Sequence, residues 1–384
     1  MILRHRSDVR TLVWALALMP AAAIAQYAVP GLAWWLLPVS GYLAYSAGVI
    51  AHNHNHSPTF VGRRLNALLS AWISIFYGHP TFVWIPTHND NHHRFRNRAG
   101  DASITWRATR KNGLIAATTY FFVAAKAQAP LTAAFLQRVR ARRPRAYAGH
   151  LAQYIVVYGT HAAALALAIA MHGGARGAAV YASALGMPAA GALWGLMFTN
   201  YVQHVDCDPW SRWNHSRDFV SGFTNFFVFD NGFHTVHHER PGLHWSELRR
   251  AHAQVAHLLD PRLQERTILR YCFKAYVLGK VLPRFAPVPV GSYDGPSQPR
   301  LTSAAITSLA PSSTEAAEAS TTTRRSSSDA ARARCSSSAA ASIDTTASSP
   351  ASATARAAES HRAPPSAESS TPLPPRSKSA LSTA

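Results

Sequence analysis

The sequence lacks the residues that several common redox and metal sites require. Its 384 residues include three cysteines, Cys207, Cys272 and Cys335, and no two of them form a CxxC pair. This odd, scattered set gives no disulfide framework, no thiolate metal site and no iron–sulfur motif. A GxGxxG dinucleotide motif and an HPGG haem motif are also absent. The chain therefore carries no redox cofactor site of these kinds.

Acidic residues are scarce as well. Only 18 Asp and Glu stand against 38 Lys and Arg, which gives a net charge of +20. Such a balance is common in nucleic-acid-binding proteins, but here the basic residues flank hydrophobic stretches and form no recognisable nucleic-acid module. Basic flanks of membrane spans explain the charge better, so we expect no nucleic-acid partner.

Long uncharged stretches are what the sequence does contain. Four of them lack Lys, Arg, Asp and Glu and are long enough to cross about 30 Å of hydrocarbon as helices. They cover residues 11–28, 31–51, 151–171 and 178–203. We expect Pro20, Pro38 and Pro188 to kink their helices, which a bundle tolerates. The sequence thus predicts an all-α integral membrane protein with about four transmembrane helices.

The connections between these stretches predict two hairpins and their orientation. Residues 29–30 and 172–177 leave room only for turns, so the first two spans pair and the last two pair. The loop over residues 52–149 carries 14 Lys or Arg against two acids. Under the positive-inside rule this loop and both termini face the cytoplasm. We therefore expect a cytoplasmic helical cap that carries the loop residues.

Other segments complete the predicted organisation. Residues 65–86 and 113–136 are apolar and are expected in the membrane interface, and residues 246–259 have the pattern of an amphipathic surface helix. From residue 291 onward Ser, Ala, Thr, Pro and Arg dominate, and this composition cannot offset chain entropy by burial. We expect one domain over residues 1–290 and a disordered tail over residues 291–384.

The N-terminus allows a second interpretation. Residues 1–25 combine a basic start, an apolar run and Ala23-Ile24-Ala25, as a secretory signal peptide does. Cleavage there would remove the first span and place His52 on the other side of the membrane. We therefore favour a retained anchor.

Histidine is the residue that carries the chemistry. Three clusters each contain a pair spaced i,i+3 or i,i+4, so on a helix both imidazoles share one face. The clusters read His52-Asn-His54-Asn-His56, His88-Asn-Asp-Asn-His92-His93 and His234-Thr-Val-His237-His238. All three border the predicted cytoplasmic side of the spans, so they can meet at one site. A solvated polar loop would not explain this common placement.

The number of clustered histidines predicts two metal ions. Imidazole suits iron, copper, zinc and nickel, and one ion takes about three or four protein ligands. Eight or nine ligands are too many for one ion and suit two. The Glu-x-x-His pattern of soluble di-iron bundles is absent.

The clusters resemble the three histidine boxes of the membrane fatty acid desaturase and hydroxylase superfamily. That family carries HxxxH or HxxxxH, then HxxHH or HxxxHH, then HxxHH or QxxHH. The matching boxes here are His52…His56, His88…His92-His93 and His234…His237-His238. Their order and the hydrophobic hairpin before the first box match over residues 11 to about 260. The resemblance implies two non-haem irons, O₂ as co-substrate and all-histidine ligands.

A fourth element strengthens the resemblance. Asn200-Tyr-Val-Gln-His204 has the spacing found at the end of the last span in relatives that resemble acyl-CoA desaturases. By resemblance, His204 would be a ninth iron ligand and Asn200 would hold a metal-bound water.

Two departures concern residues next to the ligands. His54 is an extra histidine in the first box and points away from the shared face of its neighbours on a helix, so we expect it beside the ligands. The second box uses the longer HxxxHH form, and its Asp90, with Asn91, is expected to orient imidazoles through the nitrogen that does not bind metal.

Aromatic and histidine residues outside the boxes are expected to serve packing or the surface. Trp72, Trp84 and Trp245 fit either the wall of an apolar channel or, as we favour, interfacial anchors. The histidines without a clustered partner are His5, His79, His150, His161, His172, His215, His244, His252, His257 and His361.

The resemblance implies a membrane enzyme that introduces a double bond into a fatty acyl chain. Hydroxylation or ketolation of a lipid, alkane or carotenoid is the alternative within the same chemistry, and a metal-binding or transport protein is the alternative from another class. The implied partners are a lipid substrate, the bilayer and a separate electron donor, such as a ferredoxin with its reductase. Arg94, Arg96 and Arg98 beside the second box are candidates for docking an acidic donor. The acyl carrier stays open among CoA, acyl carrier protein and phospholipid.

Overall fold

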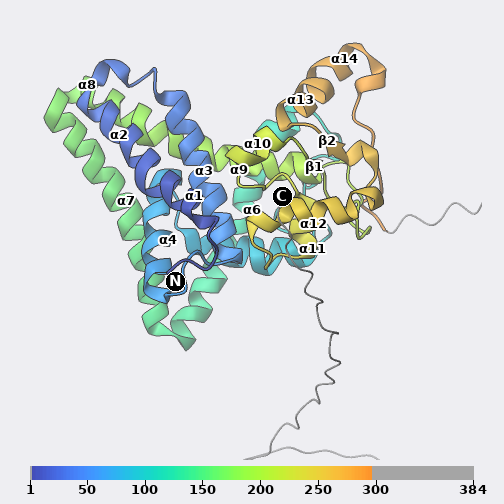
Figure 1. The fold of residues 1–384 in the computed structure, drawn as a ribbon, viewed down its shortest axis with the longest axis horizontal. Coiled ribbons are helices and arrows are strands. Elements are labelled where there is room, and N and C mark those ends of the chain that lie inside the picture. The colour runs from blue at the N-terminus through green and yellow to red at the C-terminus, as the bar shows by residue number, and fades with distance from the viewer. Residues whose placement is uncertain (1, 296–384) are drawn as a thin grey trace, which may run out of the picture. The chain divides into compact units, whose positions relative to one another are not determined.

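Figure 1 shows the helical fold, for which the computed structural model describes residues 2–295. The described strands, β1 (Asp218–Phe219) and β2 (Gln264–Glu265), form one parallel pair. The helices are α1 (Asp8–Leu12), α2 (Met19–Ala28), α3 (Leu37–His56), α4 (Arg63–Tyr77), α5 (His93–Phe95), α6 (Leu114–Arg142), α7 (Pro144–His172), α8 (Gly174–Tyr181), α9 (Met187–His204), α10 (Gly222–Phe227), α11 (His234–Glu239), α12 (Leu248–Val255), α13 (Ile268–Cys272) and α14 (Gly279–Val281). The prediction of a helical protein is confirmed.

Three helical stretches are long and apolar enough to cross a membrane. They are Asp8–Ala28, Pro144–His172 and Gly174–His204. A fourth candidate is the pair Arg63–Tyr77 and Thr81–Phe95, which is bent by 96° and has the form of a broken or re-entrant span. Three to four candidate spans agree with the predicted number of about four. Their pairing into membrane hairpins and their sidedness stay predictions.

The second predicted span, residues 31–51, is wrong in its position. The chain turns through Pro30–Leu32, and α3 begins only at Leu37 and continues to His56. Pro38 lies in the first turn of α3, where its missing N–H costs no helical hydrogen bond. The shift carries the polar first box into the same helix, and α3 is not among the candidate spans.

Two of the three predicted proline kinks take the form of π-helical turns. The segment Val13–Leu18 precedes Pro20, and the segment Ala182–Gly186 precedes Pro188. Proline cannot donate the helical hydrogen bond and its ring clashes with the preceding turn, which a wider π turn relieves. Both spans therefore stay helical across their prolines.

Two apolar clusters hold the fold together. The larger joins α3 and α4 to the span that ends in α2 and to the segments on both sides of α11, and includes Ile50, Ile73 and Phe229. The smaller joins α6, α9 and α13 through Tyr120, Tyr201 and other side chains. Because α3 and α9 end in histidines, these two apolar clusters fix the positions of those histidines.

The N-terminal residues cross the molecule and contact the segment after the third box. The buried Asp8 carboxylate accepts hydrogen bonds from Trp245 Nε1 at 3.1 Å and Thr11 Oγ1 at 3.0 Å, and lies 3.2 Å from His244 Nε2. The Arg10 guanidinium lies 4.3 Å from the centre of the Trp245 ring. Residues 2–12 thus form a strap over the C-terminal part of the described chain.

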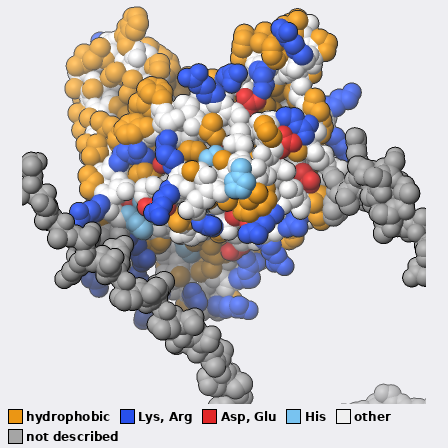
Figure 2. All heavy atoms as spheres, turned by 45° about the vertical axis from the view of Figure 1, so that its right-hand side comes forward, with side chains coloured by type: hydrophobic (Ala, Val, Ile, Leu, Met, Phe, Trp, Pro, Cys, Tyr) orange, Lys and Arg blue, Asp and Glu red, His pale blue; other side chains and the backbone are white. Residues whose placement is uncertain are grey.

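The predicted amphipathic helix at residues 246–259 is present as α12 and its flanking turns, but its apolar residues Leu248 and Ala251 are buried in the core. The exposed apolar stripe lies further on, along the helical arm α13–α14. Leu269, Phe273 and Val281 are 78%, 56% and 72% exposed there. Figure 2 shows hydrophobic side chains gathered over this arm and over the ends of α2, α7 and α8.

The predicted tail lies almost entirely outside the described residues, as do Cys335 and His361. Just beyond the predicted boundary, Tyr293 accepts a hydrogen bond from the Asp206 N–H at 2.9 Å, and Asp294 pairs with Arg110 at 2.6 Å. The first residues after 290 therefore still contact the domain.

Candidate metal centre

The first box lies at the C-terminal end of α3. His52 and His56 are one turn apart, and their rings lie 4.9 Å from each other. His54 points elsewhere, as expected: its ring contacts Thr59 Oγ1 at 3.0 Å and the Asn66 carbonyl at 3.2 Å. His54 is therefore a buried structural residue beside the centre.

The second box lies on a π-helical segment, Ile85–His92, which continues into α5. A π-helix repeats after five residues, so His88 and His93 come together, with Nε2 atoms 3.0 Å apart. His92 does not join this pair and belongs to the other group of histidines. The four-residue spacing of His88 and His92 predicts a shared face, and the π geometry separates them.

The third box forms α11, and the end of α9 supplies His204. His234 and His238 are one turn apart, with Nε2 atoms at 3.1 Å, and His204 Nε2 is 3.0 Å from His234 Nε2. His237 does not join them, and its Nε2 lies 3.0 Å from His52 Nε2.

Nine histidines consequently form two buried or half-buried groups. Within each group the ligand atoms all lie within 4.8 Å of one another. The five-histidine group consists of His52, His56, His88, His93 and His237, and the four-histidine group of His92, His204, His234 and His238. These are the nine residues that the sequence predicts as ligands, divided between two places.

The nitrogen spacing tests whether the groups suit metal ions. Seven pairs of Nε2 atoms lie 2.9–3.1 Å apart. Two nitrogens about 2.1 Å from a shared ion would be roughly 3.4 Å apart in a tetrahedral site and roughly 3.0 Å apart at right angles. The spacing and the five donors of the larger group fit a centre with more than four ligands better than a closed tetrahedral zinc site.

Hydrogen bonds fix which nitrogen of several rings is free to bind metal. His92 Nδ1 is 2.8 Å from Asp101 Oδ2, and His204 Nδ1 is 3.1 Å from the carbonyl oxygen of His215. A carboxylate and a carbonyl only accept, so each ring carries its proton on Nδ1 and presents a bare Nε2. His52 Nδ1 lies 3.0 Å from Asn53 Oδ1, which fits the same tautomer.

Asp101 is the acidic residue that sequence reasoning missed. It accepts from the Asn97 and Ser103 N–H groups at 2.8 and 2.7 Å. Burial alone would raise the pKa of this carboxyl, but the contacts with His92, Ser103 and Asn97 hold it below its usual range. The orienting role predicted for Asp90 finds no support, because Asp90 is exposed. Asp101 and Asp90 are the only acidic residues between residues 52 and 149. This scarcity is the feature of the sequence that could have identified Asp101.

The third box is electrostatically prepared for a cation. Burial, with the neighbouring imidazoles, lowers the pKa of His234, His237 and His238 well below the ordinary value. The rings are therefore neutral at neutral pH and keep lone pairs for metal binding.

Asn200 lies beside the four-histidine group and belongs to a polar chain. Its Nδ2 donates to Tyr120 Oη at 3.0 Å, and Tyr120 Oη in turn donates to the Ser103 carbonyl. With its amide N–H₂ directed to Tyr120, the Asn200 side-chain oxygen stays available. This arrangement ties α6 and α9 to the loop that carries Asp101.

Charged residues next to the boxes are partly engaged within the protein. Glu239, which follows the third box, pairs with Arg96 at 2.6 Å and Arg212 at 3.0 Å. Arg98 stacks on Trp210 at 5.5 Å, whereas Arg94 is exposed.

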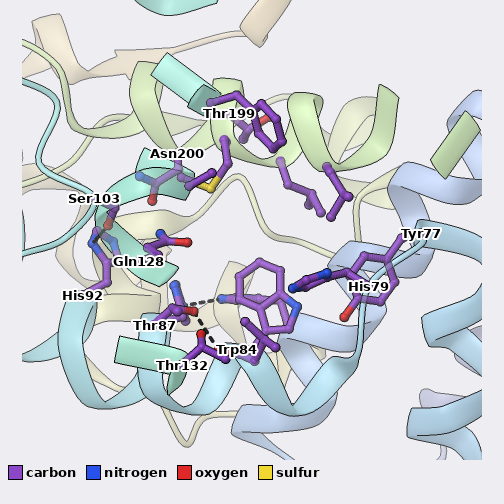
Figure 3. Close-up of a pocket in the computed structure, with 18 of the residues that line it drawn as sticks. Tyr77, His79, Trp84, Thr87, His92, Ser103, Gln128, Thr132, Thr199 and Asn200 are labelled. Carbon is purple, nitrogen blue, oxygen red and sulfur yellow. Dashed lines mark hydrogen bonds between the residues drawn. The ribbon is translucent and has the colours of Figure 1, made fainter. Parts of the chain in front are cut away.

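A largely apolar cavity of about 510 Å³ reaches both histidine groups. His52 and His88 of the five-histidine group and His92 and His234 of the four-histidine group line it. Most of its remaining wall comes from α3, α6, α9 and the bend after α4, and α7 contributes Tyr154 (Figure 3). Three alanines of α6, Ala125, Ala129 and Ala133, leave it wide.

The three tryptophans predicted near the boxes lie in different surroundings. Trp84 lines the cavity, and Trp72 Nε1 donates to the Ala15 carbonyl at 2.7 Å. Trp245 is buried, which corrects the expectation of an interfacial anchor there.

Comparison with known proteins gives one match. The family model described as fatty acid desaturase matches residues 13–268, which cover both histidine groups and the cavity wall. No curated protein and no solved structure matches the chain.

Proposed function

Because the chain belongs to the fatty acid desaturase family, we propose that it is a membrane-bound di-iron enzyme that desaturates a fatty acyl chain with O₂. The single observation that carries the proposal is the pair of histidine groups on the wall of one apolar cavity. Family membership makes the protein an oxidoreductase of the desaturase and hydroxylase type and, with its apolar helices, a membrane protein.

In this proposal the two histidine groups each hold one iron ion. Their donor set fits, because all nine donors are imidazoles and at least His92 and His204 present a bare Nε2. When bound, the irons supply the O₂-derived oxidising power that removal of hydrogen from an unactivated C–H bond requires. Asn200 is proposed to hold a water at the four-histidine group through its free oxygen.

The chain's own part is positioning and exclusion of water. The cavity accepts an extended alkyl segment, and a methylene group next to His88 and His92 would face both groups at once. Trp84 and Leu196 on its wall keep the chain in place and leave little room for water.

A separate protein is proposed to deliver the electrons. The exposed Arg94 lies directly beside the second box. Figure 2 shows Lys and Arg side chains spread over the face of the molecule that it draws. An acidic donor of the ferredoxin kind would be attracted there.

The membrane is proposed to contact the arm α13–α14 in addition to the spans. The arm packs through Tyr271 and Ala275 against α9, one of the candidate spans, and turns its exposed apolar stripe outward. A helix that is apolar on both faces suits a site between protein and lipid. Both termini and the histidines are proposed to lie on the cytoplasmic side.

The test is a fatty acid profile from cells that express the chain together with a ferredoxin and its reductase. We expect an acyl species two mass units lighter by gas chromatography and mass spectrometry, absent from a His92→Ala control. A product sixteen units heavier would replace desaturation by hydroxylation. No O₂ consumption with any lipid, combined with metal exchange across vesicles, would point to transport instead.

A further inference from the structure

The turn between α6 and α7 consists of a single residue, Arg143, which follows Arg142 and precedes Pro144. Proline lacks an N–H and disfavours the helical conformation in the residue before it, so α6 ends here. Behind the turn the two helices pack side by side, with the Phe135 and His150 rings 5.5 Å apart. Figure 1 shows them meeting at the lower end of the picture, below α4. The turn is therefore the tip of a helical hairpin.

Five arginines lie within eight residues at this tip, and all of them are exposed: Arg138, Arg140, Arg142, Arg143 and Arg145. Among residues 2–295, the ion pairs of arginine involve other positions of the chain. The sequence also contains no Asp or Glu between Asp101 and Asp206, so neither helix of the hairpin supplies a counter-charge. A concentrated positive charge of this kind attracts an anionic partner.

The same tip begins a candidate membrane span, Pro144–His172. The side chains of Leu151, Ile155 and Tyr158 on this span are 38%, 72% and 53% exposed, as expected of a face that contacts hydrocarbon. Leu151 follows Arg145 by six residues, which is about 9 Å along a helix. The headgroup layer outside the hydrocarbon core is roughly 5–7 Å deep on each side of a bilayer. Long arginine side chains at the tip can therefore reach this layer.

The tip is also connected to the candidate metal centre. The next candidate span, Gly174–His204, leads back from the turn at Gly173 and ends in the four-histidine group. As successive spans, the two place the arginines and His204 on the same face of the membrane. In addition, α6 lines the cavity as far as Leu136, two residues before Arg138. Groups bound at the tip would thus lie next to the end of the helix that forms the cavity wall.

We propose that the α6–α7 tip binds the phosphate groups of anionic phospholipids in the surrounding bilayer. Guanidinium groups form paired, charge-assisted hydrogen bonds with phosphate oxygens. Clusters of basic residues directly beside a membrane span suit anionic headgroups, and the exposed apolar side chains that follow on α7 favour a lipid surface over an acidic protein. The inference rests on the membrane location of the protein and requires neither a metal ion nor the proposed reaction.

The experiment measures the binding of two soluble short-chain lipids to the purified full-length protein in a neutral detergent, by microscale thermophoresis. Dihexanoylphosphatidylglycerol and dihexanoylphosphatidylcholine have the same acyl chains and differ in headgroup charge. We expect the wild type to prefer the anionic lipid by roughly tenfold or more, since each basic residue near a lipid surface contributes about fivefold. The double variant Arg142→Gln/Arg143→Gln should lose most of this preference. Arg142→Lys/Arg143→Lys keeps the charge and should retain most of it.

Two further variants serve as controls. Arg240→Gln/Arg250→Gln removes the same charge from two exposed arginines that follow the third box, so the lipid preference should stay unchanged. Ala133→Phe fills part of the cavity and separates a headgroup site at the tip from a lipid that binds inside the cavity. The anionic preference should persist in this variant.

Equal affinity of the wild type for the two lipids would overturn the inference, as would equal losses in the two double glutamine variants. Loss of the preference in Ala133→Phe would place the lipid in the cavity instead of at the tip. An unchanged lipid preference in Arg142→Gln/Arg143→Gln, together with weaker binding of an acidic ferredoxin, would make the tip a docking site for the electron donor. Each of these results leaves the proposed oxidation to be judged separately by the fatty acid profile.

Discussion

The Nε2 atoms of His92 and His204 lie 3.0 Å apart, although neither carries the proton that a hydrogen bond between them would need. The His92 ring proton points to the Asp101 carboxylate, and the His204 ring proton points to the His215 carbonyl. Two lone pairs therefore face each other in a buried place, an arrangement that a shared cation stabilises and that is repulsive without one.

Removal of metal should destabilise the protein strongly for this reason. An ion present at about a thousand times its dissociation constant adds roughly 4 kcal/mol to the free energy of unfolding. We expect a chelator to lower the melting temperature by several degrees, and ferrous iron to restore it. Melting in nanodiscs with and without chelator measures this, and equal melting temperatures would argue that the histidines do not share a metal.

The Asp101→Asn variant should bind metal more weakly. The carboxylate orients His92 and fixes its tautomer, and loss of such a partner typically costs about 10–100-fold in metal affinity. Competition with a chromogenic chelator gives the affinity. Asp90→Asn is the matched control, because Asp90 is exposed, and it should bind as the wild type does. Similar losses in both variants would contradict the role of Asp101.

The two histidine groups should lose metal separately. His238→Ala leaves three donors in the four-histidine group and the five-histidine group intact, so we expect about one iron per chain instead of two. His54→Gln should retain two, since His54 bonds Thr59 and Asn66 outside both groups. Elemental analysis of purified protein counts the metal. Loss of both irons in His238→Ala would show that the groups depend on each other.

Filling the cavity should change which chain lengths react. Ala133 of α6 lines the cavity together with Thr132 and Leu136, and a phenylalanine there would occupy the space of several methylene groups. We expect Ala133→Phe to favour shorter acyl chains in the product profile. Ala134→Phe, outside the cavity wall, should keep the wild-type profile. An unchanged chain-length preference in Ala133→Phe would place the substrate elsewhere.

The α13–α14 arm should touch lipid. A fluorophore on Phe273→Cys should be quenched by nitroxide-labelled lipids, because Phe273 lies on the outward apolar stripe. The same label on Arg250→Cys, on the exposed face of α12, should not be quenched. Background labelling is kept low by replacing Cys272 and Cys335 with serine. Equal quenching at both positions would remove the arm from the bilayer surface.

The sequence is sufficient to predict which histidines form the metal centre, because the order and spacing of the boxes are the same whatever type of helix each box adopts. It is insufficient to predict how they divide. His88 and His92 share a face on an α-helix, and only the π-helical turn sends them to different groups. A single extra residue in a turn leaves almost no trace in the residue pattern.

Asp101 illustrates a second limit. It lies nine positions after His92. The chain between them turns back through Arg96 and Asn97, which have φ angles of 46° and 62°. Such left-handed residues other than glycine are rare and are held by their surroundings. The Asn97 side chain bonds the His204 carbonyl at 3.1 Å, so the loop takes this form only when α9 is in place.

The strap formed by residues 2–12 can pack in place only after most of the chain has been synthesised. Asp8 is made long before its partners His244 and Trp245, which are 236 and 237 positions later in the chain. Contacts of such separation form late and slowly, because most of the polypeptide must be made and folded first. Closure of the strap therefore comes after synthesis of all three boxes, so a ribosome-bound chain stalled before residue 244 would still hold its N-terminal segment open to proteases.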